Sequence, residues 1–380
     1  MKGYFDNAAT TYKKPDGMYE SISQFMQQYG ANIGRGNYAN VLKSGDQLVK
    51  LRRNLLKLVG APESKTTIIT PSATIALNTI LFGIDLNDGD TIYISHFEHN
   101  AILRPLFEIQ NRIKINIKYL PMSPNNRYEF DLAQTEADFK IAPPKMTIIS
   151  HVSNVLGIIA PVETIAHLSK QYDALVVVDA SQSCGILNCS LVNVDYYVFA
   201  GHKTLLGPDG IGGFICNTNT KLKPFIFGGT GIDSANKQMP KDLPERFEAG
   251  SRNLMAIVGL NYSTEWLLKN MDFVRQSEKI NMSKLYDILS SYKYIELISP
   301  YPDACSIISC KVAGYTSDEF GNILAERGIS TRTGLHCAPD AHRYIKSFPE
   351  GLIRFSVSCF TSDEDFILLD QVLHEIADDL

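Results

Sequence analysis

The chain has 380 residues, of which 44% are hydrophobic, and a formal net charge of -5. A chain of this length can bury a large core in about two domains. The lysines and arginines are scattered without a basic run, which argues against nucleic-acid binding, and no apolar stretch approaches the ~20 residues that span a bilayer. The seven cysteines are widely spaced and the first residues lack an apolar signal core, so we expect reduced thiols and a cytoplasmic location.

Short apolar segments alternate with helical patterns through the first half of the chain. We expect strands at residues 66–70, 91–95, 115–120, 146–151, 175–179, 196–200 and 211–216. We expect helices at residues 72–82 and between residues 150 and 176, where one side carries Val162, Ile165, Ala166 and Ser169. Several strands are apolar almost throughout, as in sheets buried on both faces. The alternation therefore predicts an α/β fold with a mostly parallel sheet covered by helices.

The rest of the chain has a different pattern. Residues 227–250 are rich in Gly, Pro and charge and predict a long loop, after which a long helix is expected from about residue 261. Strands are expected at residues 305–311 and 352–358, with a capping-box helix opening at residues 316–319 between them and ending at Gly328. Ser362 is expected to cap a last helix whose apolar stripe is core, formed by Phe366, Leu369, Leu373 and Ile376.

These patterns predict two domains. The larger covers residues 15–260. The smaller is a C-terminal α+β domain that combines residues 1–14 and 261–380.

Two residues carry the strongest chemical signal. Asp179 ends one apolar strand, and Lys203 follows another in a turn of small residues. Ligands of open α/β sheets bind at the carboxyl ends of the strands. A lysine amine forms a Schiff base with the aldehyde of pyridoxal 5'-phosphate, and a carboxylate holds its pyridine nitrogen protonated. We therefore expect this cofactor, although Asp179 also suits a helix cap and Lys203 an exposed loop.

Other polar residues at strand ends suit the same cofactor. Thr74, in the turn that opens the helix at residue 72, and His202 are candidates for its phosphate, because free amides at a helix N-terminus bind anions. Ser72 also fits a plain N-cap. Gln182 and Asn154 are candidates for the ring hydroxyl. His99 or its neighbour His96 can stack on the ring, with a structural histidine or half of a metal pair as alternatives.

Cys337 is the candidate nucleophile, since His336 adjoins it and His342 lies nearby in sequence. Zinc is disfavoured here because no second cysteine stands at CxxC spacing, so we expect no metal. Arg354 lies inside an expected strand, where a buried guanidinium needs a carboxylate, and the carboxylate of a substrate fits.

Together these segments resemble the class V aminotransferase superfamily, and within it the cysteine desulfurases, closest to the branch of SUF-type enzymes and selenocysteine lyase. The resemblance runs nearly end to end and in order. It includes residues 4–11, 32–36, 72–74, 151–157, 248–251 and 353–356, together with Glu98-His99-Asn100, Asp179-Ala180-Ser181-Gln182, Gly201-His202-Lys203 and Arg332-Thr333-Gly334-Leu335-His336-Cys337.

The resemblance implies a fold-type I pyridoxal phosphate enzyme with a mixed seven-stranded sheet, acting on L-cysteine. It implies Lys203 as the Schiff-base lysine, Cys337 as the persulfide carrier, and His99 as a third catalytic residue stacked on the ring. Cofactor-binding residues would be Ala73, Thr74, Asn154, Asp179, Gln182 and His202, with Ser251 reaching the phosphate from the second subunit of a homodimer. Substrate-binding residues would be Asn7, Ala8, Arg332 and Arg354.

The sequence departs from the usual family pattern at Ile75, Ala200, Leu335 and Ser251-Arg252, and none of these positions is the lysine, the aspartate or the cysteine. Other reactions remain open: selenocysteine lyase with L-selenocysteine as substrate, cystine C–S lyase, or transamination. A catalytically silent scaffold in sulfur assembly and a zinc redox switch are non-enzymatic alternatives. The protein that accepts the sulfur, whether in iron–sulfur assembly, thiolation or selenium metabolism, is not indicated.

Overall fold

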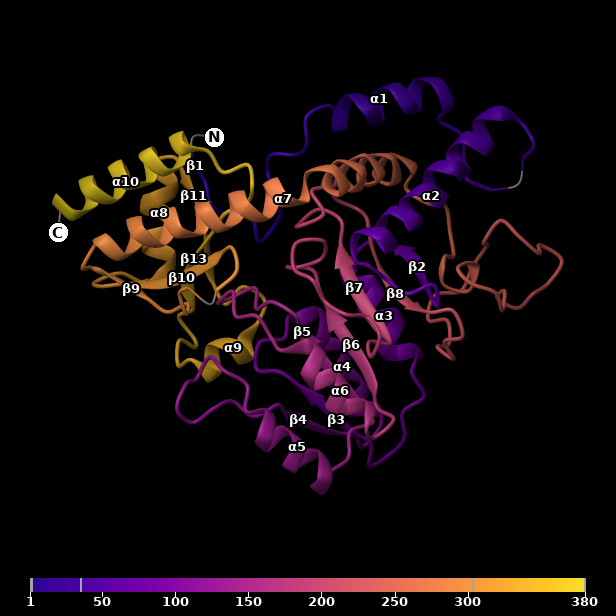
Figure 1. The fold of residues 1–380 in the computed structure, drawn as a ribbon, viewed down its shortest axis with the longest axis horizontal. Helices are drawn as coiled ribbons and strands as arrows, with labels where there is room; N and C mark the ends of the chain where they lie inside the picture. Colours follow the sequence, from indigo (N-terminus) through magenta and orange to yellow (C-terminus); the bar gives the residue numbers. More distant parts are fainter. Residues whose placement is uncertain (1–2, 35, 303, 379–380) are drawn as a thin grey trace.

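The computed structural model describes residues 3–34, 36–302 and 304–378 (Figure 1). This part of the chain contains a seven-stranded sheet and a four-stranded sheet. Two further short strands, β1 and β11, pair with each other. Helix α7 (Leu254–Ser291) runs from the larger sheet to the smaller one, so the two halves share one long element (Figure 1). In the described residues, no helix is both long enough and apolar enough to cross a membrane.

The larger sheet confirms the predicted α/β architecture. Only β8 runs antiparallel to its neighbours, and the other adjacent strands are parallel. The strands in spatial order are β2 (Lys65–Thr70), β8 (Gly212–Asn217), β7 (Tyr196–Ala200), β6 (Leu175–Asp179), β5 (Met146–Ser150), β3 (Thr91–Ile94) and β4 (Asn116–Tyr119).

Helices cover both faces of this sheet, which explains why its central strands are apolar throughout. On β6, Val176 and Val178 pack into the core shared with α2 (Ala39–Leu58), α5 (Leu132–Ile141), α6 (Val162–Lys170) and α7. Val177 points the other way and packs with α3 (Ala73–Gly83) and α4 (Asn100–Arg112). The register places Ser150 of β5 beside Asp179 of β6, so polar residues end neighbouring strands at one edge.

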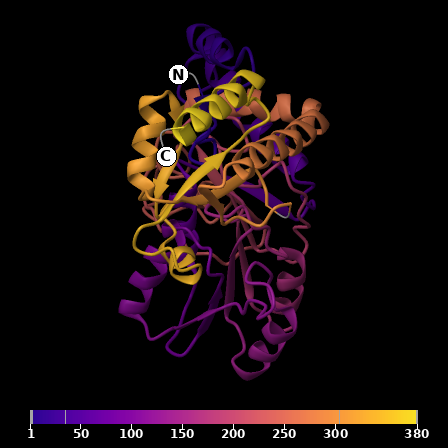
Figure 2. The same ribbon diagram turned by 90° about the vertical axis from the view of Figure 1, so that its left-hand side faces the viewer.

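The smaller sheet is antiparallel, in the order β12 (Arg332–Gly334), β13 (Leu352–Ser356), β10 (Ile307–Val312) and β9 (Ile295–Leu297). Beside it, β1 (Gly3–Tyr4) pairs in parallel with β11 (Ile329–Ser330). Helices α8 (Ser317–Glu326) and α10 (Asp363–Asp378) pack here, and the predicted stripe of α10 lies in the core. The predicted capping box is present at Thr316 and Glu319. Figure 2 shows this half of the molecule facing the viewer.

Several elements differ from the sequence prediction. Helix α7 begins at Leu254, before the expected start at residue 261, because Asn253 caps it by accepting a hydrogen bond from the amide of Ala256. The helices that were not expected are α1 (Met18–Tyr29), α2, α4, α5 and α9 (Pro339–Tyr344). The expected loop at residues 227–250 contains only a short 3-10 helix (Glu245–Phe247). The boundary proposed at residues 260 and 261 falls within α7 and stays a prediction, as does the one at residues 14 and 15. Arg35, in one of the resembling motifs, lies outside the described residues.

Candidate active site

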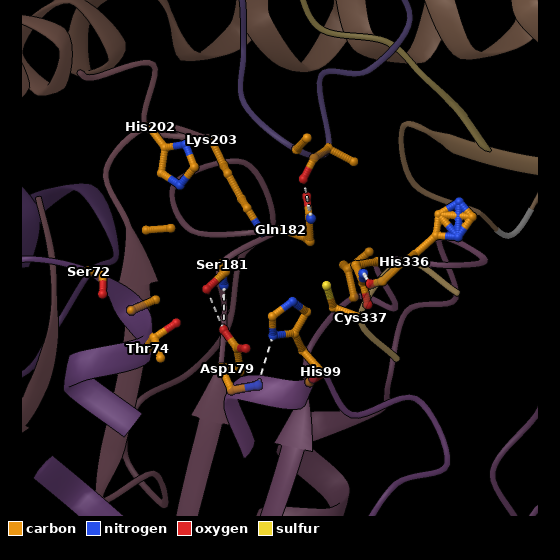
Figure 3. A pocket seen from close by; sticks show the side chains of 18 of the residues that line it. Ser72, Thr74, His99, Asp179, Ser181, Gln182, His202, Lys203, His336 and Cys337 are labelled. Carbon is orange, nitrogen blue, oxygen red and sulfur yellow. Dashed lines mark hydrogen bonds between the residues drawn. The ribbon is translucent and has the colours of Figure 1, made fainter. Parts of the chain in front are cut away.

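A cavity of about 250 Å³ opens at the carboxyl edge of the larger sheet, where residues of the smaller half close over it (Figure 3). It brings together most of the predicted site residues, which come from segments far apart in sequence. Those that line it are Ala8, Ala73, Thr74, His99, Asn154, Asp179, Gln182, His202, Lys203, Arg332, Cys337 and Arg354. Two predicted residues, Asn7 and Ser251, do not line it.

Asp179 and Lys203 both face this cavity. Oδ1 of Asp179 accepts hydrogen bonds from the amide and the hydroxyl of Ser181, at 2.9 and 2.6 Å, which fixes the carboxylate at the end of β6 (Figure 3). Burial lowers the pKa of the Lys203 amine to about 8, although Asp179 opposes this effect. The arginines of the cavity lower it further. The site therefore holds a carboxylate and an amine that is partly neutral near neutral pH.

The N-terminus of α3 forms one side of the cavity, with Ser72 and Thr74 near His202 (Figure 3). Ser72 is the N-cap of α3, because its hydroxyl accepts a hydrogen bond from the amide of Ile75. This confirms the alternative given for Ser72 in the sequence analysis. The first amides of a helix have no internal acceptor and favour an anion. The N-terminus of α3 packs closely against Gly212 of β8. A Cβ at this position would lie 2.6 Å from the amide nitrogen of Ala73, so a residue without a side chain is needed here.

Two histidines of the cavity are neutral at neutral pH. Burial, reinforced by the charge of Lys203, lowers the pKa of both His99 and His202 to about 4. Nδ1 of His99 accepts a hydrogen bond from the amide of Ala101 and caps α4, so the ring carries its proton on Nε2. Nδ1 of His202 lies 2.9 Å from Oδ1 of Asp209. His99 can therefore offer the neutral N–H of its Nε2 to a ligand.

Glu98 directly precedes His99 in the sequence and is fully buried. Its carboxyl group accepts hydrogen bonds from the amides and hydroxyls of Ser95 and Ser150, at the carboxyl ends of β3 and β5. Burial raises the pKa of Glu98 to about 7 despite these four donors. Glu98 thus joins two strand ends directly under the cavity.

Cys337 lies across the cavity from Ser72 and Thr74 (Figure 3). It and His336 both have left-handed backbone conformations, with φ of 57° and 49°. Such values are unfavourable for residues with a Cβ, so the surroundings must hold them. The side-chain amide of Asn154 donates to the carbonyl oxygen of His336 at 2.7 Å, and the amide of Asn100 donates to that of Cys337 at 2.6 Å. The larger half of the molecule therefore fixes the thiol loop.

Arg354 of β13 reaches the cavity from the smaller sheet and is only 2% exposed. Nη1 donates to the carbonyl oxygen of Asn154 at 2.9 Å, and Nη2 donates to Oδ1 of Asp6 at 2.8 Å. Nε is buried and has no hydrogen-bond partner among the described residues. The Nε–H of this guanidinium thus remains for a ligand.

The N-terminal segment forms another wall. Gln182 donates to the carbonyl oxygen of Ala8 at 2.8 Å, and Ala8 donates to the hydroxyl of Ser356. The side-chain amide of Asn7 donates to the carbonyl oxygen of Ser356, so Asn7 anchors this segment outside the cavity. Ser251 lines a separate cavity of about 370 Å³, which Thr70 and Ile75 also line. The roles of these residues stay predictions.

Residues 3–369 match the family model described as aminotransferase class V. The chain belongs to the class V aminotransferase family. A "probable cysteine desulfurase" of Vibrio cholerae serotype O1 is 30% identical over 99% of this chain and 93% of its own. Another, from Methanothermobacter thermautotrophicus, is 28% identical over 98% and 94%.

The solved structures agree with the sequence comparison. An apo cysteine desulfurase from Thermococcus onnurineus NA1 has a TM-score of 0.90 and 25% identity, and the match covers 99% of this chain and 95% of that one. The predicted membership and the predicted fold are thereby confirmed.

Sequence reasoning missed three residues that support the site: Asp6, Glu98 and Ser181. All three lie in motifs that resemble the family, and each is adjacent to a residue with an expected role. A charged or hydroxyl residue in that position was the available signal. Their partners, however, depend on contacts that the sequence alone does not give.

Proposed function

We propose that this chain is a pyridoxal phosphate-dependent cysteine desulfurase, which converts L-cysteine to L-alanine and leaves the sulfur as a persulfide on Cys337. The observation that carries the proposal is that Lys203, Asp179 and Cys337 line one cavity in a class V aminotransferase chain. The names of the relatives support the same activity.

The residues around the cavity fit the cofactor. Its phosphate suits the N-terminus of α3, where Thr74 adds a hydroxyl and His202 lines the same cavity. Asp179, held by Ser181, suits the pyridine nitrogen, and Lys203 suits the aldehyde. When bound, pyridoxal phosphate withdraws electrons from the α-carbon of an amino acid.

Arg354 would hold the carboxylate of the substrate through its unpartnered Nε. Lys203 would remove the α-proton, because an amine with a pKa of about 8 is partly neutral near that pH. The histidines are weaker bases, since the pKa of His99 is about 4 and burial holds that of His336 well below its usual value. Lys203 is therefore the principal base of the site.

Cys337 would supply the thiolate that attacks the sulfur of the substrate. The new S–S bond forms as the C–S bond breaks, and the electron pair of that bond stays with the β-carbon. Protonation of this carbon gives the methyl group of L-alanine. Cys337 keeps the sulfur as a persulfide, so the sum is one cysteine and one thiol to one alanine and one persulfide.

Turnover requires a thiol that accepts the sulfur. We propose a separate sulfur-acceptor protein, because Cys337 is exposed and can be reached by a partner. All seven cysteines are free thiols, which supports a reducing, cytoplasmic setting.

A homodimer with shared sites is part of the proposal. Ser251 is exposed and lies outside the cavity of its own chain. It could therefore reach a phosphate only in a neighbouring subunit, as the family resemblance implies.

The test is an assay of alanine and sulfide from L-cysteine, with and without a reducing thiol, on the wild type and Cys337→Ala. The wild type should form alanine, with a sulfide yield that depends on the thiol, and the variant should bind the cofactor but form none. Equal alanine formation by both proteins would remove Cys337 from the reaction. Parallel assays with L-selenocysteine and with an oxo-acid acceptor would reveal a lyase or a transaminase instead.

A further inference from the structure

Two arginines of the site stand directly opposite each other. Arg332 of β12 pairs with Arg354 of β13 in the antiparallel register. Like charges in opposite positions destabilise a sheet. Arg354 is almost fully buried, whereas about half of the Arg332 side chain is exposed. A buried guanidinium next to a second one requires an anion.

Asp6 is that anion. Its Oδ1 lies 2.8 Å from Nη2 of Arg354, and its Oδ2 lies 3.5 Å from Nη1 of Arg332. The backbone holds Asp6 there, because the amide of Phe5 donates to Ser330 and the amide of Ser356 donates to Phe5. One carboxylate therefore bridges both guanidinium groups from the adjacent strand edge.

Among the residues that the structure describes, this arrangement leaves one uncompensated positive charge at this end of the cavity. Two guanidinium groups carry two positive charges, and Asp6 removes one of them. The unpartnered Nε of Arg354 provides the N–H that a further anion would accept. This end of the cavity can therefore neutralise one carboxylate of a ligand.

We propose that Asp6 is a specificity-determining residue, which restricts this site to α-amino acids with a single carboxylate. The proposal rests on the proposed function for the role of Arg354. A dicarboxylate would bring a second negative charge into the cavity, where both described arginines already share Asp6 and one carboxylate. Repulsion and an unpaired charge would then weaken its binding.

The test measures binding of two probes to the holoenzyme. L-alanine carries one carboxylate and L-aspartate two, and binding of either is followed by the visible absorbance of the bound cofactor. Asp6→Asn keeps an oxygen acceptor for Arg354 but removes the charge. The affinity for L-aspartate relative to L-alanine should rise by roughly tenfold or more in this variant. Asp6→Glu should retain the wild-type ratio.

Arg332→Gln tests the same charge count from the other side, and because Arg332 is half exposed its loss should not prevent folding even if Asp6→Asn does. Here the ratio should shift away from L-aspartate. Asp363→Asn is the matched control, because it removes an ion-paired carboxylate of the smaller half on the surface. An unchanged ratio in Asp6→Asn and Arg332→Gln would overturn the proposal and leave Asp6 as an anchor of the N-terminal segment.

These probes need no sulfur transfer. An enzyme that binds both amino acids but forms no alanine from cysteine would refute the proposed function and still test the role of Asp6.

Discussion

Asn154 donates a hydrogen bond to the carbonyl oxygen of His336, 2.7 Å away, and so links the end of the larger sheet to the residue that precedes Cys337. The backbone carbonyl oxygen of the same asparagine accepts a hydrogen bond from Arg354. One residue thus positions both the thiol loop and the guanidinium proposed for the substrate carboxylate.

Replacing Asn154 with Ala should slow sulfur transfer more than α-proton removal. Without its side-chain amide, the left-handed conformation of His336 and Cys337 loses a support, and a misplacement of about 1 Å can slow a reaction by ~100-fold. Alanine formation from cysteine and exchange of the α-proton in deuterated water are measured on the same variant. An equal loss of both rates would show that Asn154 acts mainly on the cofactor.

The pH dependence should identify Lys203 as the base. Since burial lowers its pKa to about 8, α-proton exchange should rise with pH below 8 and level off above it. The measurement uses Cys337→Ala, so that ionisation of the thiol does not contribute. Lys203→Arg should abolish exchange. A rate that stays constant or falls as pH rises through 8 would be incompatible with this role.

Glu98 should make the fold less stable as pH rises. Its pKa is raised from 4.5 to about 7 in the folded state, so the folded protein binds the proton more tightly than the unfolded chain does. This contribution is fully present below pH 4.5 and is lost as pH rises through 7, by about 3 kcal/mol.

Glu98→Gln mimics the neutral carboxyl group and removes the dependence. Urea unfolding of both proteins at pH 5 and pH 8 should show the wild type losing stability relative to the variant at the higher pH. If the difference in stability between the wild type and the variant is the same at pH 5 and at pH 8, Glu98 does not titrate in this range.

Mixing two inactive variants should test the shared site. Lys203→Ala removes the base, and Ser251→Asp places a negative charge where the partner's phosphate is proposed to lie. In a mixed dimer one site would contain both changes and the other neither, so about a quarter of the sites should regain activity after subunit exchange. If subunits exchange without any recovery, Ser251 does not act across the interface.

The central sheet could be predicted because each of its strands has a recognisable local sequence pattern. β5 and β6 are buried along their whole length, and their apolar runs end in Ser150 and Asp179. Helix α1 gave no such signal, since Met18 is its only buried residue and Gly17 caps it without a side chain. Tyr38, the N-cap residue of α2, also makes no side-chain capping hydrogen bond.

The site was predictable only where a residue type carries its own chemistry. Lys203, Asp179 and Cys337 are recognisable in that way. Asp6 is not, because its role arises from contacts with Arg332 and Arg354, more than 300 positions away in sequence. The position of Ser251 outside its own cavity likewise depends on how the chain folds back, which no local pattern specifies.

The most direct test is the mass of the peptide that contains Cys337 after one turnover of L-cysteine without reductant. We predict that this peptide gains one sulfur atom, in an amount equal to the L-alanine formed. L-alanine formed without that gain, or a gain on another of the seven cysteines, would contradict it.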